Sequence, residues 1–176
     1  MTPMYWGGAD KIFPVIGDLV AAWENPEDLM TWLDDYQGKQ FLQQAYNKHN
    51  LYMIGYNVSP TESLISINPI RNISDLSGQM ARVPAGMASE FFNKIKVKGR
   101  KIAANKVKEA FERNLITLAD YSTLYENLRA GLYDVAKHTN YPGFHSSQVL
   151  DFVVNKKKWD LLPDEYKNSI EKHVAV

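Results

Sequence analysis

The sequence predicts an α/β protein, because short apolar runs alternate along it with segments whose apolar residues recur at helical spacing. The run LYMIGYNV at 51–58 is typical of a strand, and the segment 86–95 has the single apolar side of a helix. Apolar residues make up 45% and charged residues 23% of the 176 residues, which are ordinary values for a globular chain. We therefore expect a packed core in one domain, or in part of a larger protein.

The chain carries 20 basic and 20 acidic residues, so its composition gives no electrostatic indication of binding to nucleic acid or anionic membrane. Basic clusters at 94–101 and 156–158 are expected to be solvated surface. Cysteine is absent, which excludes disulfides, thiol nucleophiles and cysteine-based metal sites. The longest apolar region, 12–23, is interrupted by proline, glycine and aspartate and does not predict a membrane span. The first ten residues lack the basic and apolar regions of an export signal.

The first third of the chain predicts two helices followed by two strands. One helix begins at Pro26, since proline is favoured in a first turn, and a second runs from Gly38 to about His49. Strands are expected at 51–58 and 63–67.

The middle of the chain alternates short elements. A helical turn is expected within 72–78, and strands at 79–83, 97–103 and 115–119, separated by apolar-sided helices. Of these helices, one spans about 86–95 and the other follows Asn105 as its cap.

The longest helix is expected after Thr123, which together with Glu126 fits a capping box. Leucines and a valine follow at a three-to-four spacing, which predicts an apolar side that continues to about 138–140. Beyond it, the segment 141–166, YPGFHSSQVLDFVVNKKKWDLLPDEY, predicts a Pro-Gly turn, a buried strand, a cap at Asn155 and a final helix from Pro163.

This order of elements resembles the C-terminal half of the solute-binding proteins of TRAP (tripartite ATP-independent periplasmic) transporters. In the branch that binds 2-oxo and 2-hydroxy acids, a YPGWHE-like turn, a strand ending in VN and a KWxxLP helix start follow one another as they do here. The segment 75–82, DLSGQMAR, matches that family's Asp-Leu-x-Gly-x-x-x-Arg, and 132–145, LYDVAKHTNYPGFH, is similar to its LYKVAKYYYYPGWH. The likeness is strong after Asp75 and weak before it.

The resemblance implies a two-lobed, periplasmic-binding-protein-like fold, N-terminally truncated, with a long bridging helix. Under this hypothesis residues 1–50 are a remnant of the first lobe, 51–118 the second lobe, 119–140 the bridging helix, and 141–176 a C-terminal strand with helices. The lobes of such proteins close on a solute by hinge bending.

The resemblance also implies the site residues. Arg82 corresponds to an arginine that ends a strand and binds the solute's carboxylate, a task that suits the planar fork of a guanidinium. The alternative is a surface arginine with its own acidic partner. Asp120 corresponds to a glutamate that ligates a cation, either divalent or sodium, and Tyr121 to a tryptophan that offers its carbonyl. The alternative for Asp120 is a cap of the long helix.

Three further positions differ from the family's pattern. Thr61, or Glu62 if the register shifts by one residue, stands where the family has an amide side chain. Phe144 replaces a tryptophan and keeps an apolar wall, and Ser146 stands where the family has glutamate. Because the number of charged ligands sets the affinity for a divalent ion, these changes weaken the expectation of a bound metal. His138 and His145 share no metal-binding spacing with another residue.

The function that follows is binding of a small organic carboxylate, of the 2-oxo or 2-hydroxy acid class, in the periplasm for delivery to the membrane permease subunits of a TRAP transporter. An enzyme is disfavoured, because the sequence has no Gly-rich phosphate loop, no G-x-S-x-G elbow and no metal-binding histidine pair. The alternative is a truncated, diverged relative that binds no solute and serves as a structural or interaction module. Loss of part of a sheet leaves an open edge, so self-association through the truncated lobe is also expected.

Overall fold

The computed structural model describes residues 2–143 and 146–174. The chain divides into two units, each with its own sheet. The first unit comprises Met1–Leu19, Asn25–Ser59 and Ser147–Val176, and the second comprises Val20–Glu24 and Pro60–Ser146.

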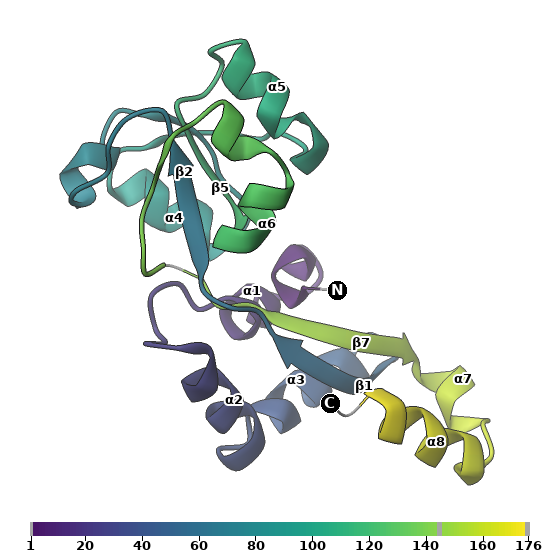
Figure 1. Cartoon of the computed structure of the whole chain (residues 1–176). Helices are drawn as coiled ribbons and strands as arrows, with labels where there is room; N and C mark the ends of the chain where they lie inside the picture. The colour runs from purple at the N-terminus through teal and green to yellow at the C-terminus, as the bar shows by residue number, and fades with distance from the viewer. Residues whose placement is uncertain (1, 144–145, 175–176) are drawn as a thin grey trace. The chain divides into compact units, whose positions relative to one another are not determined.

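The sheet of the first unit has two strands, β1 (Leu51–Val58) and β7 (Val149–Asn155), which run antiparallel (Figure 1). Leu51 pairs with Asn155 at one end and Val58 with Val149 at the other, with an irregularity between Met53 and Gly55.

Several short helices surround this ribbon, and polar caps begin two of them. Asn25 accepts a hydrogen bond from the Asp28 amide at 2.9 Å, and Asn155 accepts one from the Lys158 amide at 3.1 Å, as the sequence predicted for Asn155. The helices are α1 (Ile12–Gly17), α2 (Pro26–Asp35), α3 (Gly38–Asn47), α7 (Lys156–Asp160) and α8 (Asp164–Val174), with a 3-10 turn at Pro3–Trp6.

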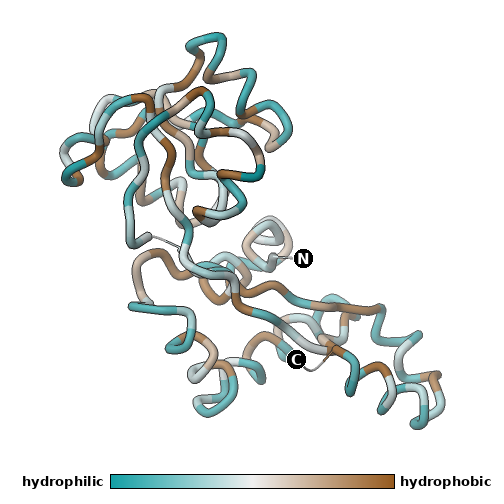
Figure 2. Tube along the Cα trace, in the orientation of Figure 1, coloured by the Kyte–Doolittle hydropathy of each residue, from teal (hydrophilic) through white to brown (hydrophobic). Residues whose placement is uncertain are grey.

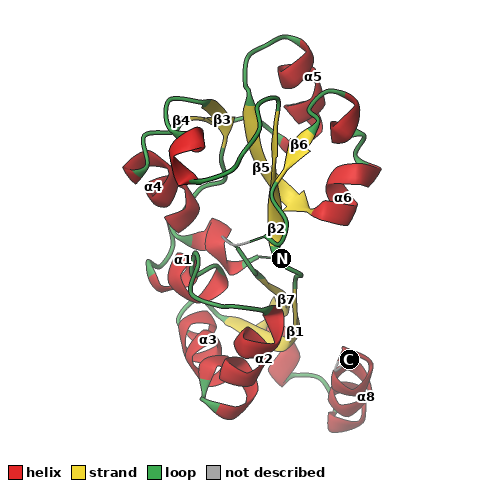
Figure 3. Ribbon diagram, turned by 60° about the vertical axis from the view of Figure 1, so that its left-hand side comes forward, coloured by secondary structure: helices red, strands yellow, loops and turns green. Residues whose placement is uncertain are grey.

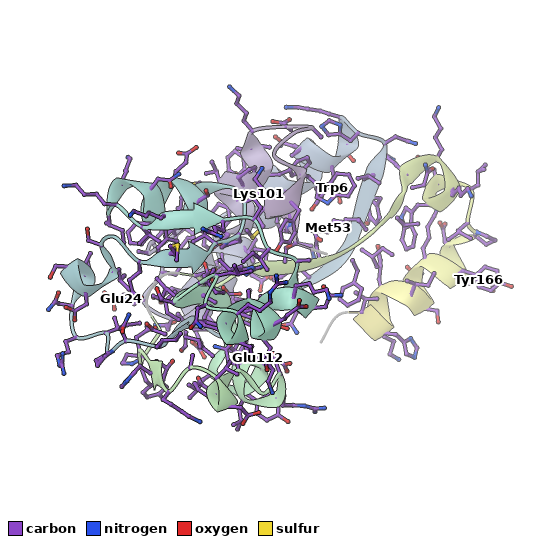
Figure 4. The ribbon with its side chains drawn as sticks, turned by 90° about the horizontal axis from the view of Figure 1, so that it is seen from above. Trp6, Glu24, Met53, Lys101, Glu112 and Tyr166 are labelled. Carbon is purple, nitrogen blue, oxygen red and sulfur yellow. The ribbon has the colours of Figure 1, made fainter. Side chains whose placement is uncertain are left out.

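The core of the first unit comes from the inward sides of these helices and from β1 and β7. Its fully buried side chains include Phe13, Leu33, Leu42, Met53 and Val149. The α8 helix buries no residue, and its Tyr166 is 56% exposed and points outward (Figure 4).

The sheet of the second unit has five strands in the order β4-β3-β5-β2-β6. The strand β3 runs parallel to β4 and β5, whereas β2 runs antiparallel to β5 and β6. The strands are β2 (Glu62–Ser66), β3 (Met80–Arg82), β4 (Lys98–Arg100), β5 (Leu118–Thr123) and β6 (His138–Thr139). Figure 3 shows α4 on one side of these strands and α6 on the other.

Alternation of side chains along the strands divides the second unit's core into two halves. On one face Ile65 and Ala119 pack with Phe111 of α5 (Val107–Glu112). On the other face Leu64 and Leu118 pack with Phe92 of α4 (Met87–Lys94). Hydrophobic residues accordingly run along the sheet strands of Figure 2.

The sequence predicted a long bridging helix, and this prediction is wrong. The helix α6 spans only Leu124–Arg129, and a 3-10 turn at Leu132–Asp134 follows it. Two further 3-10 turns of this unit, Ile73–Leu76 and Ala104–Lys106, precede α6 in the chain. Gly131 adopts a left-handed backbone conformation with φ of 66°, which ends a helix. Leu128, expected on a buried side, is 62% exposed.

The lobe boundaries also differ from those expected. The sequence placed residues 51–58 with the second lobe, but β1 belongs to the first unit because it pairs with β7. Thr123 does cap α6, as predicted, by accepting a hydrogen bond from the Glu126 amide at 3.3 Å.

Candidate functional site

The candidate site lies at one end of the second unit's sheet, where Arg82 is the last residue of β3. Arg82 pairs with Ala119 on β5, and both strands run in the same direction. The next residues of β5, Asp120 and Tyr121, therefore follow at the carboxyl end of the sheet, where α/β proteins generally bind ligands. Parallel strand pairing thus brings together three residues that the sequence had singled out.

The Arg82 side chain is half-buried and is oriented by backbone oxygens. One terminal nitrogen, Nη1, donates a hydrogen bond to the main-chain carbonyl of Asp120. Its Nε donates a longer bond of 3.5 Å to the carbonyl of Ile102. The guanidinium carbon lies 6.0 Å from the centre of the Tyr121 ring, within range of a cation–π interaction.

No carboxylate lies within ion-pair distance of Arg82 among residues 2–143 and 146–174. The alternative of a surface arginine with its own acidic partner therefore finds no support in the described part of the chain. Within the same residues, Nη2 donates to no protein acceptor. The guanidinium keeps its positive charge and part of its donor fork for another anion.

Asp120 lies inside β5, and its side chain is only 1% exposed. Asp120 does not cap α6, because Thr123 occupies that position, so the capping alternative for Asp120 is wrong. Tyr121 is half-buried and packs against the cluster that contains Ala119 and Phe111.

Thr61 lies one residue before β2, whose first residue, Glu62, pairs with Thr123 of β5. Because β2 runs antiparallel to β5, Thr61 lies at the same end of the sheet as Asp120. Thr61 is half-buried and Glu62 is 7% exposed, and the Glu62 amide donates to the Ser146 carbonyl at 2.8 Å. Phe144 lies outside the described residues.

The described residues contain no group of three histidine, aspartate or glutamate side chains that could hold a metal ion. A cation near Asp120 would have that carboxylate together with main-chain and solute oxygens. Such a donor set suits a hard cation with oxygen ligands, but it brings few charged groups to the ion.

Two features of the second unit escaped sequence reasoning. The carbonyl of Asp120, rather than its side chain, contacts Arg82, and no side-chain pattern signals a backbone contact of this kind. Asn127 is fully buried and donates from Nδ2 to the Ser63 carbonyl at 2.9 Å, although a polar residue in a short helix normally indicates a solvated face.

Known proteins resemble the chain in both sequence and structure. A monocarboxylate 2-oxoacid-binding periplasmic protein of Nostoc is 26% identical over 147 residues, which are 81% of this chain and 40% of the relative. The crystal structure of a TRAP periplasmic solute-binding protein from Rhodobacter sphaeroides, in an open apo state, is 29% identical with a TM-score of 0.76. That match covers 97% of this chain and 54% of the Rhodobacter chain.

A second solved structure shows the same fold at lower identity. It is a TRAP periplasmic solute-binding protein from Pseudoalteromonas atlantica with bound sodium and pyruvate, 23% identical with a TM-score of 0.80. The match covers 98% of this chain and 52% of the other. The chain thus spans about half the length of these relatives. None of the described helices is long and apolar enough to cross a membrane.

The family model described as bacterial extracellular solute-binding protein, family 7, matches residues 15–176, which include every strand of both sheets. The chain therefore belongs to this family, the solute-binding proteins of TRAP transporters.

Proposed function

We propose that the chain binds the carboxylate of a small 2-oxo or 2-hydroxy acid through Arg82. The observation that carries the proposal is a half-buried guanidinium that backbone carbonyls orient and that no described carboxylate neutralises. A solute carboxylate supplies the missing negative charge and can accept two parallel hydrogen bonds from the guanidinium fork. The Nostoc relative, named for 2-oxoacid binding, supports this class of solute.

The remaining residues have supporting roles in the proposal. Tyr121 borders the guanidinium and limits the access of water to it, and Thr61 adds to the solute's surroundings at the same end of the sheet. Phe144 remains a candidate for an apolar wall from the sequence alone. Asp120 is the carboxylate that a sodium or calcium ion would use. The Pseudoalteromonas structure, which holds sodium together with pyruvate, supports the presence of a cation in such a protein. The carboxylate–Arg82 pair itself requires no cation and no catalytic residue.

In the cell we propose a periplasmic protein that delivers its solute to the membrane permease subunits of a TRAP-type transporter, and that acts as a carrier rather than as an enzyme. The family and the periplasmic relatives support this role. The first and second units would correspond to parts of the family's two lobes.

Thermal denaturation with a panel of acids tests the proposal. Pyruvate, lactate, longer 2-oxo acids and succinate are compared with and without calcium. A solute at about 100 times its Kd adds about 2.7 kcal/mol of stability, which raises Tm by roughly 5–11 °C for a chain of this size. Arg82→Ala should abolish the shift.

The matched control is Arg100→Ala. Arg100 pairs with Arg82 across β3 and β4 but is exposed, so its loss should leave the shift unchanged. Equal loss in both variants would indicate a general charge effect instead of a site.

A second candidate function is that of an interaction module without solute binding. Ser146, at the position where the family has glutamate, favours it, because the exchange removes a charged ligand. Absence of a shift with every acid would support this candidate and contradict the first.

Independently of solute binding, we also propose that the chain self-associates.

A further inference from the structure

The strand β1 has an open outer edge. It pairs with β7, and no other strand among the described residues joins its sheet. Ser59 donates to the Gln148 carbonyl at 2.9 Å, toward β7, so the backbone groups of Tyr56 and Val58 point to the opposite side. The Val58 amide accordingly bonds the side chain of Asn57, at 2.7 Å, instead of β7.

A side chain already covers the other end of this edge. The Met53 amide donates to Gln43 Oε1 at 2.9 Å, and Gln43 Nε2 donates to the Leu51 carbonyl at 3.4 Å. Gln43 thus occupies the place of a neighbouring strand at the start of β1. Tyr56 lies between the two covered points, and its N–H and C=O face an edge without a strand.

A hollow of about 280 Å³ lies beside this part of β1. It is lined by the consecutive residues 54–57 together with Met30 and Asp34 of α2 and Lys39 of α3. The hollow provides room for the side chains of an added strand. A surface without a hollow would exclude those side chains.

The sequence of β1 lacks the features that protect edge strands. Its eight residues, LYMIGYNV, carry no charge. By contrast β4, an edge strand of the other sheet, consists of Lys98, Gly99 and Arg100, all exposed, and such charged edges resist pairing. A sheet of two strands is also marginal in water, and a third strand is normally needed.

The charges beside the hollow are matched to each other. The Tyr56 hydroxyl donates to Asp34, and Lys39 Nζ lies 5.9 Å from the centre of the Tyr56 ring. Asp34 and Lys39 are both exposed. In a two-fold interface each patch meets its own copy, so a patch with one acid and one base can satisfy both charges against itself.

We propose that the outer edge of β1 pairs with the same edge of a second copy, antiparallel about Tyr56, in the strand order β7-β1-β1-β7. An uncharged strand, an open backbone edge and a self-complementary pair of charges together fit a second copy of this chain. The inference rests on the self-association proposed above and names its surface. It is independent of Arg82 and of solute binding.

Two charge reversals test the interface. In the two-fold pair, position 34 of one copy faces position 39 of the other. Asp34→Lys therefore brings the new lysine against Lys39 of the second copy, and Lys39→Asp brings the new aspartate against Asp34 of the second copy. Each variant alone should dimerise at least about fivefold more weakly in sedimentation equilibrium, because two unfavourable contacts replace two favourable ones. An equimolar mixture should recover the parental association, which also shows that both variants are folded.

The control is Glu165→Lys, which makes the same change in net charge as Asp34→Lys on the exposed first turn of α8. It should leave dimerisation unchanged. A monomeric parent would overturn both the self-association and this interface. A dimer that both reversals leave intact would overturn the β1 interface and leave self-association through another surface. In either case the thermal shift with pyruvate still reports separately on solute binding.

Discussion

Replacement of Arg82 by lysine separates charge from geometry at the proposed solute site. Lysine keeps the positive charge but presents a compact ammonium, so it cannot make the planar, bidentate pair with a carboxylate. It also loses the Nη1 bond to the Asp120 carbonyl that orients the side chain. One hydrogen bond between charged groups contributes about 1.5–3 kcal/mol. We therefore expect Arg82→Lys to weaken solute binding by roughly 10- to 150-fold.

Isothermal titration with the acid that gives the largest thermal shift measures this change. The control is Arg100→Lys, made at the exposed register partner of Arg82, which should bind like the parent. Affinity of Arg82→Lys within about twofold of the parent would refute the bidentate pair, since less than about 0.5 kcal/mol would then depend on the fork. Equal weakening in both lysine variants would refute the assignment of the site to Arg82.

Three further changes test the packing and the chemistry around both sheets. Tyr46→Phe removes the hydroxyl that donates to buried Asp151. Burial raises the pKa of Asp151, whereas the hydrogen bond from Tyr46 lowers it by favouring the ionised carboxylate. The lost bond therefore costs more where Asp151 is ionised, and the loss of Tm should be larger at about pH 8 than at about pH 4. An equal or smaller loss at the higher pH would contradict this, and exposed Tyr125→Phe should change neither Tm. Asp120→Asn keeps the backbone carbonyl that holds the guanidinium, so it should abolish any calcium dependence of the thermal shift while retaining the shift itself; loss of both would mean that the carboxylate serves the solute directly. Phe111→Ala, at a position 2% exposed, should cost about 3–5 kcal/mol in urea denaturation, and a cost below about 1 kcal/mol would show that the second unit's core is not packed around it.

Local patterns predicted most strands and helices, because their signals lie within a few residues. Pro26 and Asn155 mark helix starts in the structure as they do in the sequence. The helix α1 was missed, since Pro14 and Gly17 look like breakers in an apolar run. Proline is tolerated there because the first turn of a helix leaves its amides without internal partners.

Two errors arose where local and tertiary signals diverge. The capping of Thr123 was correct, but the leucine spacing after it predicted a helix that Gly131 ends early. The strand β1 was assigned to the wrong unit, because its partner β7 lies far away in the sequence. Pairing of Leu51 with Asn155 depends on how the whole chain folds, and a single sequence carries little information about such contacts.

At the site, the sequence motif identified Arg82 as the end of a strand, and the structure adds what orients it. Had Asp120 contacted the guanidinium through its carboxylate, the pair would have been neutral and a solute would have had to compete with it. Contact through the carbonyl instead gives the guanidinium a direction while leaving its full charge uncompensated. Because this contact depends on the pairing of β3 with β5 and not on the Asp120 side chain, the proposed carboxylate binding does not require that the site also hold a cation.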